Sequence, residues 1–424
     1  MHLPPDPPGR AGTGHGQRSG QRSGQRSEQG SEQGSVAGGD VVVVGAGVVG
    51  LAVAWRLAGA GLRVVVADPE PGRGSSWAAA GMLAPVTEVH YGEEALLALN
   101  LASAARWPAF AAELETDANR AVGYRRSGTL LVAAEEGDRA LAADLHDFMA
   151  GLGLEAESLT LRRARELEPA LSPAIAGALW APGDHQVDNR LLVAALLEAA
   201  ERAGARLVRA RVAAVAVGGG RVEGVRLEDG TALDAPCVVV AAGVGTGALG
   251  GLADGVLPPV RPVKGQILRM RAGPEVPGLS RIVRGIVHGA SVYLVPRRDG
   301  SVVVGATAEE RGFDTTVTAG AVYELLRDAR RVVPSVGEYV LDEALAGLRP
   351  GSPDNAPMVG PAPGGPEGLV LATGHYRNGV LLAPVTADAV LALVAGGGLP
   401  PVAAPFTPAR FAPSEPAAGG GMPH

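Results

Sequence analysis

Hydrophobic runs broken by glycines recur along this chain and predict repeated units of strand, turn and helix. Val41 to Val44 are four consecutive valines, as is typical of a strand buried on both faces of a parallel sheet. Apolar residues then recur at helical spacing from Leu51 to Ala58, and glycines follow that helix. A second valine-rich run covers residues 63–68. Together these segments predict a strand, a helix and a neighbouring parallel strand.

The same pattern returns twice further along the chain. Residues 235–243 form another apolar run that ends on glycine, and residues 369–384 have the pattern of a strand, a glycine loop and a helix start. Between them, from residue 258 to 339, polar and apolar positions alternate, which is typical of antiparallel strands. A helix is expected near residues 319–333. The chain therefore combines a parallel sheet with an antiparallel one.

Periodicity between these regions predicts further elements and a domain plan. Helices are expected over residues 93–110, 137–152 and 191–203, and a strand pair over 123–134. Residues 206–217 and 221–227 are expected to be two strands that form a hairpin. We predict an α/β fold, or α+β taken as a whole, with a Rossmann-like dinucleotide-binding domain and a substrate domain whose sheet is mainly antiparallel. The dinucleotide-binding domain comprises residues 38–90, 183–257 and 346–400, and the substrate domain comprises residues 91–182 and 258–345. Residues 1–37 are expected to be a disordered, low-complexity tail, and residues 401–424 a flexible one.

Composition excludes several classes of function. The 424 residues carry a net charge of −7 without a basic stripe, which argues against nucleic acid as the main partner. The single cysteine, Cys237, excludes an intrachain disulfide and a cysteine-based metal cluster, so we expect no metal and favour a cytoplasmic location. Cys237 lies in an apolar run and is expected to be a small core residue. No segment has the length of a membrane span, and the first 39 residues lack the apolar core of a secretory signal.

Gly45, Gly47 and Gly50 follow the first strand in the spacing G-x-G-x-x-G. In this context glycines permit a tight turn, let a pyrophosphate approach the backbone and let the helix pack on the strand. The helix N-terminus adds N–H donors and the positive end of a dipole. Asp68 ends the second strand about 20 residues later, where a carboxylate receives the ribose hydroxyls of an adenine dinucleotide. The alternatives are a glycine turn that binds nothing and an acid that caps a helix, and the motif does not separate NAD from FAD.

The loop after Asp68 is rich in small and hydroxyl side chains. Ser75 and Ser76 could donate hydrogen bonds to a phosphate, and Ala80-Gly81-Met82 would let a flat ring approach the backbone. A small-residue helix packed on the sheet explains this loop equally well.

Several longer motifs carry a resemblance to a known family. In order, they are Gly45-Ala-Gly-Val-Val-Gly50, Ser76-Trp-Ala-Ala-Ala-Gly-Met-Leu-Ala-Pro85, Pro262-Val-Lys-Gly-Gln266, Tyr293-Leu-Val-Pro-Arg297, Gly305-Ala-Thr307, Gly347-Leu-Arg-Pro-Gly351 and Gly374-His-Tyr-Arg-Asn-Gly-Val-Leu-Leu-Ala-Pro384. With these motifs the chain resembles the FAD-dependent amino-acid and amine oxidases of the D-amino-acid oxidase superfamily. Within that superfamily it is most similar to the glycine oxidases of thiamine biosynthesis. The alanine-rich and closing motifs are more specific than the dinucleotide loop.

The resemblance implies FAD, bound non-covalently because the only cysteine lies far from the closing loop. The implied cofactor contacts are Gly45, Gly47, Val48, Val49, Gly50, Asp68, Pro69, Ser75, Ser76, Ala80, Gly81, Met82, Val212, Gly243, His375, Tyr376, Arg377, Asn378, Gly379, Val380 and Leu381. Val212 would meet the adenine end, and residues 375–381 would surround the flavin.

The resemblance also implies that Arg349 and Arg377 hold the substrate, with Tyr293 closing over its carboxylate. A planar guanidinium binds a carboxylate through two parallel hydrogen bonds, which suits an amino acid in an apolar pocket. From the residues alone, Arg349 could instead satisfy loop carbonyls or an exposed acid. Arg377 could bind a flavin phosphate or order its loop, and Tyr293 could cover the core. His375 is expected to hydrogen-bond with backbone rather than act as a base, and Lys264 to be structural or near the flavin.

The implied reaction is the oxidative deamination of glycine, with sarcosine or small D-amino acids as further substrates. In this family hydride passes from the substrate Cα to flavin N5, and glycine, oxygen and water give glyoxylate through an imine, with ammonia and hydrogen peroxide. The alternatives are a sarcosine or D-amino-acid oxidase, a dehydrogenase that reduces a quinone, a flavin-bound scaffold or redox sensor, and an NAD dehydrogenase. The expected partners are a small amino acid and oxygen, without nucleic acid or stable membrane association. The family suggests a homo-oligomer.

Overall fold

Six strands form the sheet that the valine-rich runs predict. In the computed structural model, which describes residues 35–36 and 38–412, their order is β19-β20-β13-β2-β3-β9. The strands are β2 (Val41–Val44), β3 (Val64–Ala67), β9 (Arg206–Val208), β13 (Cys237–Val240), β19 (Met358–Pro361) and β20 (Leu369–Thr373). All neighbours are parallel except β19 and β20. The valines of β2 are buried because this strand lies inside the sheet with both faces covered.

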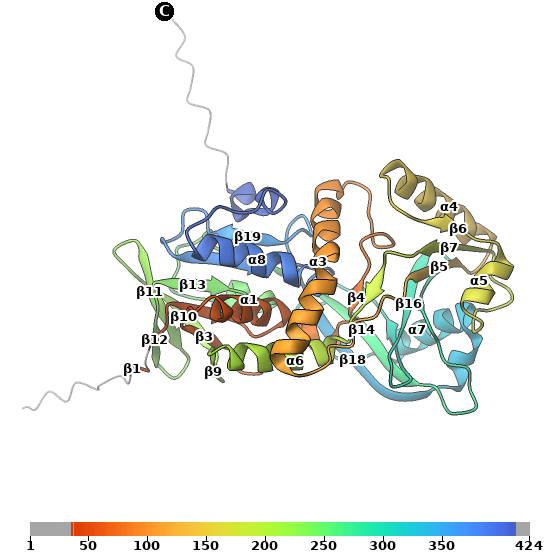
Figure 1. Cartoon of the computed structure of the whole chain (residues 1–424), viewed down its shortest axis with the longest axis horizontal. Helices are drawn as coiled ribbons and strands as arrows, with labels where there is room; N and C mark the ends of the chain where they lie inside the picture. The colour runs from red at the N-terminus through yellow and green to blue at the C-terminus, as the bar shows by residue number, and fades with distance from the viewer. Residues whose placement is uncertain (1–34, 37, 413–424) are drawn as a thin grey trace, which may run out of the picture. The chain divides into compact units, whose positions relative to one another are not determined.

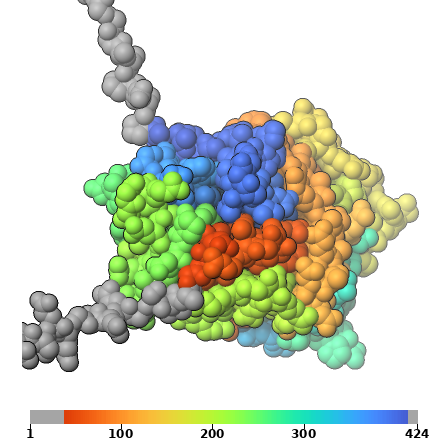
Figure 2. Space-filling model, turned by 60° about the vertical axis from the view of Figure 1, so that its left-hand side comes forward, coloured from red at the N-terminus to blue at the C-terminus, as the bar shows by residue number. Residues whose placement is uncertain are grey.

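Helices cover one face of this sheet. α1 (Val48–Gly59) begins directly after the glycine turn and packs against α6 (Asn189–Arg202) and α8 (Ala383–Val394). Figure 2 shows the α1 segment flanked by α8 on one side and α6 on the other. The long helix α3 (Glu94–Ala118) also contacts α6 and α8 (Figure 1), and its buried Trp107 donates a hydrogen bond to the Leu381 carbonyl at 2.9 Å. α3 therefore shares the core of the parallel sheet, although its sequence position falls within the predicted substrate domain.

A smaller sheet covers the other face, in the order β1-β12-β11-β10. Its strands are β1 (Ser35–Val36), β10 (Val212–Gly218), β11 (Arg221–Leu227) and β12 (Ala232–Asp234). The predicted hairpin is present as β10 and β11. The single strand predicted over 206–217 is instead two, because residues 206–208 extend the parallel sheet beside β3 and the chain turns before Val212.

Eight strands form the second large sheet, in the order β18-β14-β17-β16-β15-β5-β7-β6. They are β5 (Thr129–Ala133), β6 (Glu157–Ser158), β7 (Gly177–Ala181), β14 (Arg261–Arg271), β15 (Ile282–Val287), β16 (Ala290–Pro296), β17 (Ser301–Gly305) and β18 (Val340–Gly351). Only β15 and β5 pair in parallel, so the sheet is mainly antiparallel, as predicted. α7 (Ala319–Val332) packs on β14 to β17, while α4 (Glu136–Gly151) and α5 (Leu161–Leu167) pack near β7 (Figure 1).

Short elements connect the two large sheets. β4 (Met82–Leu83) pairs with β8 (His185–Gln186), and α2 (Ser75–Ala78) contacts α6 and β18. The last residue of β18, Gly351, bridges to His375 in the closing loop after β20. The closing loop of the parallel sheet is thereby tied to the edge strand of the antiparallel one. The exact domain boundaries stay a prediction.

The two ends of the chain differ in what the structure describes. Residues 1–34, 37 and 413–424, which cover most of the first predicted tail and half of the second, lie outside the described residues. Residues 404–411 form two short helices, η3 (Ala404–Phe406) and η4 (Pro408–Phe411), and Phe406 is buried against the helical face of the parallel sheet. Two further short helices are η1 (Gly243–Ala248) and η2 (Pro334–Glu338). Among the described residues, every helix is too short or too polar to cross a bilayer.

Candidate active site

A cavity of about 250 Å³ is lined by residues from both large sheets. One part of its wall comes from the carboxyl ends of β2, β3, β13 and β20, where ligands bind in open α/β sheets. The other part comes from residues of β14, β16 and β18. The cavity therefore runs from a dinucleotide-type turn to the antiparallel sheet.

Most of the predicted site residues line this cavity. Those predicted to contact the cofactor and found in the wall are Gly45, Gly47, Val48, Val49, Asp68, Ser75, Ser76, Ala80, Gly81, Met82, Gly243, His375, Tyr376, Arg377, Gly379 and Val380. The predicted substrate residues Arg349, Arg377 and Tyr293 are also in the wall. The predicted residues outside the wall are Gly50, Pro69, Val212, Asn378 and Leu381.

Packing accounts for several residues that lie outside the wall. Val212 and Leu381 point into hydrophobic clusters on the two faces of the parallel sheet. The backbone N–H of Asn378 donates to the His375 carbonyl at 2.9 Å, so Asn378 shapes the closing loop from behind. The contacts predicted between these residues and a cofactor stay predictions.

The glycine turn is built as the motif requires. Gly45 has φ of +103°, a left-handed conformation that L side chains rarely adopt, and a Cβ there would lie 2.5 Å from the Ala241 carbonyl oxygen. A Cβ on Gly50 would lie 2.0 Å from the Gly45 carbonyl oxygen. Gly50 thus permits close packing of α1 on the turn, which is why it lies behind the cavity.

Asp68 and Ser76 hold the turn in place as well as facing the cavity. The Asp68 carboxylate accepts hydrogen bonds from the Ala46 N–H at 2.7 Å and the Glu70 N–H at 2.8 Å. The Ser76 hydroxyl oxygen accepts from the Val48 N–H at 2.9 Å, at the N-terminus of α1. The hydroxyl hydrogen of Ser76 remains available to donate to an anion at the same place.

The closing loop is fixed by polar contacts on its buried side. The His375 ring bonds with the Thr386 hydroxyl at 3.0 Å, not with backbone as predicted, and burial lowers the pKa of His375 to about 4. His375 is therefore neutral at pH 7, and its ring Nε2 is engaged by the Thr386 hydroxyl. The backbone N–H of Tyr376 donates to the Pro350 carbonyl at 2.9 Å. This contact joins the closing loop to the strand that carries Arg349.

Arg349 lies on β18, opposite Val263 of β14. Its Nη1 donates to the carbonyls of Thr307 at 3.0 Å and Lys264 at 3.4 Å. A Cβ on Gly265 would lie 2.4 Å from Nη1, so the guanidinium rests directly over that glycine. Within the part of the chain that the structure describes, Arg349 forms no ion pair with a carboxylate. Its charge is therefore available to an anion in the cavity.

Tyr293 of β16 forms another part of this wall. A Cβ on its cross-strand partner Gly305 would lie 2.5 Å from the phenol oxygen, so the ring covers that glycine. Burial raises the pKa of the Tyr293 phenol, with the charge of Arg349 acting in the opposite direction. The phenol is therefore a hydrogen-bond donor at neutral pH.

Two ion pairs contribute one charged residue each to the wall. Arg377 lines the cavity and is paired with Glu93, whose side chain is 21% exposed. Glu88 also lines the cavity and is paired with Arg284 at 3.3 Å. Arg377 and Arg349 thus differ because only Arg377 has a carboxylate partner among the described residues.

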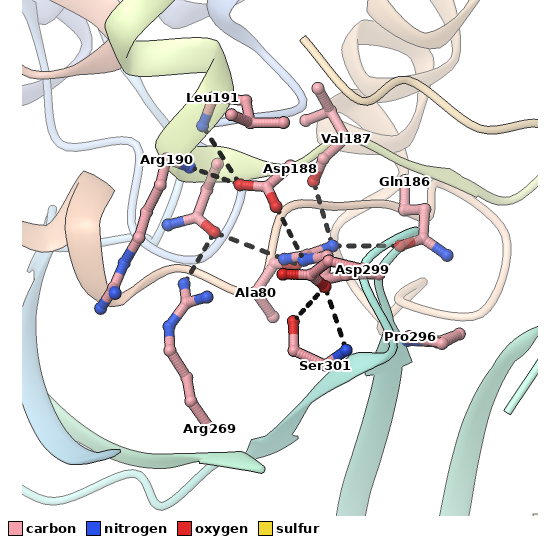
Figure 3. A network of polar contacts seen from close by, with 12 residues as sticks. Ala80, Gln186, Val187, Asp188, Arg190, Leu191, Arg269, Pro296, Asp299 and Ser301 are labelled. Atoms are coloured by element: carbon pink, nitrogen blue, oxygen red, sulfur yellow. Dashed lines mark hydrogen bonds and ion pairs between the residues drawn. The ribbon is translucent and has the colours of Figure 1, made fainter. Parts of the chain in front are cut away.

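Behind the cavity, a buried polar network holds the loop that contains Ala80 (Figure 3). Arg297, which follows β16, donates to the carbonyls of Ala80 at 2.6 Å and Val187 at 3.2 Å and to the Gln186 amide oxygen at 3.0 Å. Asn189 donates in turn to the Ser76 carbonyl at 2.8 Å. Burial lowers the pKa of Arg297 to about 10, so it stays charged at neutral pH. This network ties the antiparallel sheet to the small-residue loop.

Several wall residues were missed by sequence reasoning. They include Glu88, Gly265, Ile267, Gly347 and Thr373. Gly265, Ile267 and Gly347 lie inside or beside quoted motifs on β14 and β18, so strand alternation could have assigned them. Nothing in the local pattern around Glu88 indicates that it reaches the cavity.

Two residues with reactive side chains, Lys264 and Cys237, do not line the cavity. Lys264 is 1% exposed and pairs with Asp314 at 2.7 Å, on the face of β14 opposite Gly265. Cys237 is half-buried and packs against the core on the helical face of the parallel sheet, and burial raises its pKa to about 11. The described residues contain no cluster of His, Cys, Asp and Glu side chains that could hold a metal ion.

Comparison with known proteins identifies close relatives of this architecture. The family described as FAD dependent oxidoreductase matches residues 40–393. The bifunctional protein ThiO/ThiG of Synechocystis sp. is 36% identical over 378 residues, which cover 88% of this chain and 54% of that protein. The glycine oxidase of Geobacillus kaustophilus is 36% identical over 368 residues, covering 84% of this chain and 92% of that one.

The solved structures agree with this result. The crystal structure of glycine oxidase from Geobacillus kaustophilus has a TM-score of 0.80 and 35% identity, covering 88% of this chain and 99% of that one. The chain spans about half the length of the bifunctional relatives that it matches.

Proposed function

Because the chain belongs to the FAD-dependent oxidoreductase family, we propose that it is an oxidase that uses FAD to deaminate glycine. The reaction converts glycine, oxygen and water to glyoxylate, ammonia and hydrogen peroxide. Sarcosine and small D-amino acids are further candidate substrates of the same site. The observation that carries the proposal is Arg349, a cavity-lining arginine that has no carboxylate partner among the described residues.

Arg349 is suited to bind the substrate carboxylate. A carboxylate buried without a partner is strongly unfavourable, and a guanidinium meets it with two parallel, charge-assisted hydrogen bonds. The carbonyls of Thr307 and Lys264 already hold Nη1, so the plane of the guanidinium is fixed before substrate arrives. Binding the carboxylate in a fixed plane orients the Cα–H bonds of the amino acid.

Tyr293 and Arg377 have different parts in this proposal. The protonated Tyr293 phenol can donate to the same carboxylate from a neighbouring strand. Arg377 is paired with Glu93, so its attraction for a second anion is reduced. We therefore assign carboxylate binding mainly to Arg349, with Arg377 closing the wall of the cavity.

The other end of the cavity fits FAD. The Gly45 turn leaves no room for side chains, the N-terminus of α1 faces the cavity, and Ser76 retains a hydrogen to donate. The adenine and phosphate half would be held by Gly45, Val48, Asp68 and Ser76. The flavin half would be held by the closing loop together with Ala80 to Met82. Bound FAD supplies the two-electron oxidation of the carbon next to the amine and the return of those electrons to oxygen.

No side chain in the wall is required as a general base. His375 is neutral at pH 7 but is engaged by Thr386 on the buried side of its loop. The Glu88 carboxylate is held in its ion pair with Arg284. The chain's own contribution is therefore to orient the amino acid and to keep water away from it.

The biological setting is part of the proposal. The motifs resemble the glycine oxidases of thiamine biosynthesis, so we assign the imine product to the thiazole branch of that pathway. The single cysteine supports a cytoplasmic location. A homo-oligomer is proposed from the family resemblance alone. The alternative function is a sarcosine or D-amino-acid oxidase, or a dehydrogenase of the same superfamily.

Peroxide yield with matched substrates tests this proposal against its alternatives. Glycine, sarcosine, D-alanine and D-proline are compared under air, with hydrogen peroxide measured for each and ammonia measured for glycine and D-alanine. An oxidase of glycine gives one peroxide per glycine consumed and the highest kcat/KM with glycine. Flavin reduction without peroxide would identify a dehydrogenase, and a higher kcat/KM with another amine would reassign the substrate.

A further inference from the structure

Glu88 is a carboxylate at the cavity wall with a cation directly behind it. Its side chain is 15% exposed and lines the cavity, while the Arg284 side chain is 13% exposed and does not line it. The Arg284 Nη1 lies 3.3 Å from the Glu88 Oε1. Glu88 therefore separates Arg284 from the substrate space.

Arg284 is rigidly placed for such a role. Its Nη1 donates to the Thr87 carbonyl at 2.8 Å, and Nη2 lies 3.5 Å from the Ser291 hydroxyl. Its Nε is buried without a hydrogen-bond partner. Arg284 is also the cross-strand partner of Tyr293. Burial and the charge of Arg349 affect the pKa of the Tyr293 phenol most, and the charges of Glu88 and Arg284 come next. The pair thus lies at the substrate end of the cavity.

The charges at this end of the cavity leave one cation uncompensated. Arg377 is neutralised by Glu93 and Arg284 by Glu88, whereas Arg349 has only carbonyl partners among the described residues. One carboxylate can therefore be accommodated on Arg349. A second carboxylate on the same molecule would approach the oxygens of Glu88.

We infer that Glu88 determines substrate specificity by excluding molecules with a second carboxylate, and that Arg284 behind it is a latent binding site for that carboxylate. Like charges placed against each other disfavour the wrong ligand without any change in the contacts of the right one. Replacing Glu88 by a neutral side chain removes this repulsion. It also leaves the positive charge of Arg284 uncompensated beside the cavity. The inference rests on the proposed function and names a substrate class that the site rejects.

Dicarboxylates and their mono-amides test this inference because they are matched in size and differ in one charge. Malonate, succinate and glutarate are each compared with the corresponding mono-amide, on purified protein containing FAD. Binding is followed by the change in the flavin absorption spectrum and by competition with glycine. For the unmodified protein we expect each dicarboxylate to bind at least about tenfold more weakly than its mono-amide.

Two variants separate the roles of the pair. In Glu88→Gln we expect the preference to reverse, so that at least one dicarboxylate binds more tightly than its mono-amide. In the double variant Glu88→Gln/Arg284→Gln we expect this gain to be lost, because the latent site is removed. Comparison of the double variant with Glu88→Gln isolates the contribution of Arg284. Glu113→Gln, at an exposed ion pair with Arg56, is the matched control and should keep the preference of the unmodified protein.

Some results would overturn the inference. An unchanged preference in Glu88→Gln would show that Glu88 does not exclude the second carboxylate. A reversal that persists in the double variant would show that Arg284 is not its site. FAD content and thermal unfolding of each variant show whether the site is intact, and spectral binding is read even if glycine is not oxidised. Failure of glycine to reduce the unmodified protein contradicts the proposed function instead.

Discussion

At the scale of single residues, the two arginines of the cavity differ in their partners. Arg377 has Glu93 as its counter-ion, and Arg349 has two carbonyl oxygens that fix its orientation without cancelling its charge. A site that must attract a carboxylate needs a cation of the second kind. The structure therefore distinguishes two residues that the family resemblance both assigns to the substrate.

Replacing Arg349 tests this distinction. We expect Arg349→Ala to lower kcat/KM for glycine mainly through KM, because the substrate carboxylate loses its partner in an apolar pocket. The loss corresponds to about 3–5 kcal/mol, the usual effect of removing one partner of a buried ion pair. Arg377→Ala should have a smaller effect on KM, since its charge is already compensated.

The control for this prediction is an arginine on the neighbouring strand. Arg271→Ala, at an exposed ion pair with Asp342, should leave KM unchanged. All three variants should retain FAD. A glycine KM for Arg349→Ala equal to that of the unmodified protein would remove Arg349 from the substrate site.

His375 makes stability depend on pH. Its pKa is lowered from 6.5 to about 4 by burial, so between these values the unfolded chain binds more protons than the folded one. The stabilising contribution is complete above pH 6.5 and is lost as the pH falls toward 4. The expected loss is about 3 kcal/mol across this window.

The contribution of His375 is isolated by comparison with a variant that does not titrate. His375→Gln keeps a hydrogen-bonding group near Thr386 and has no proton to gain. The free energy of unfolding should fall more steeply with acid in the unmodified protein than in the variant. Parallel curves between pH 4 and pH 6.5 would contradict the assignment.

At the scale of elements, strand β14 faces the cavity on one side and the segment of residues 306–318 on the other. Gly265 faces Arg349, while Lys264 and Gln266 face residues 306–318. Lys264 is paired with Asp314, and the backbone N–H of Gln266 donates to the Thr307 hydroxyl at 2.9 Å. This segment carries the Thr307 carbonyl that positions Arg349.

Removing a contact that holds this segment should therefore weaken substrate binding, although the changed residue does not line the cavity. In Lys264→Met the tie to Asp314 is lost, and we expect glycine KM to rise by about tenfold because Arg349 is less firmly oriented. FAD content should not change, since Lys264 lies outside the cavity wall. Arg311→Met, an exposed arginine in the same segment, is the control. An equal loss of FAD and of glycine binding in Lys264→Met would indicate general unfolding instead.

At the scale of the whole molecule, buried polar contacts join the antiparallel sheet to the segments that line the cavity from the other side. Arg297 links the end of β16 to the Ala80 carbonyl and to the start of α6. We expect Arg297→Gln to lower the free energy of unfolding by about 3–5 kcal/mol, because buried acceptors lose a charged donor. Chemical unfolding measures this change. The exposed neighbour Arg298→Gln is the matched control, and equal losses in both variants would contradict the role of Arg297.

Much of this molecule could be predicted from its sequence, and the rest depends on contacts between distant segments. The buried valine runs, the glycine turn and the alternation after residue 258 are local signals, and they located the sheets. Most of the predicted residues of the cavity wall came instead from the motifs that resemble a known family. The division of residues 206–217 between two sheets depends on pairing with β3. The burial of α3 among α6 and α8 depends on tertiary packing.

The ion pairs and side-chain hydrogen bonds of the site were harder to predict from the sequence. The pairing of Arg377 with Glu93, and of Glu88 with Arg284, joins residues far apart along the chain. The side chain of His375 bonds to Thr386 in the following helix. Such partners decide which charge is free to act, and a motif that names only one member of a pair does not reveal them.

The most direct test of the central claim is the absorption spectrum of the purified protein, recorded without oxygen before and after glycine is added. We predict an oxidised flavin spectrum that is bleached by glycine and recovers when air is admitted. The same experiment on Arg349→Ala should require far more glycine for the same bleaching. A flavin spectrum that glycine leaves unchanged, while another small amine bleaches it, would contradict the assignment of glycine as substrate. A colourless protein that cannot be reconstituted with FAD would contradict the account of the cavity itself.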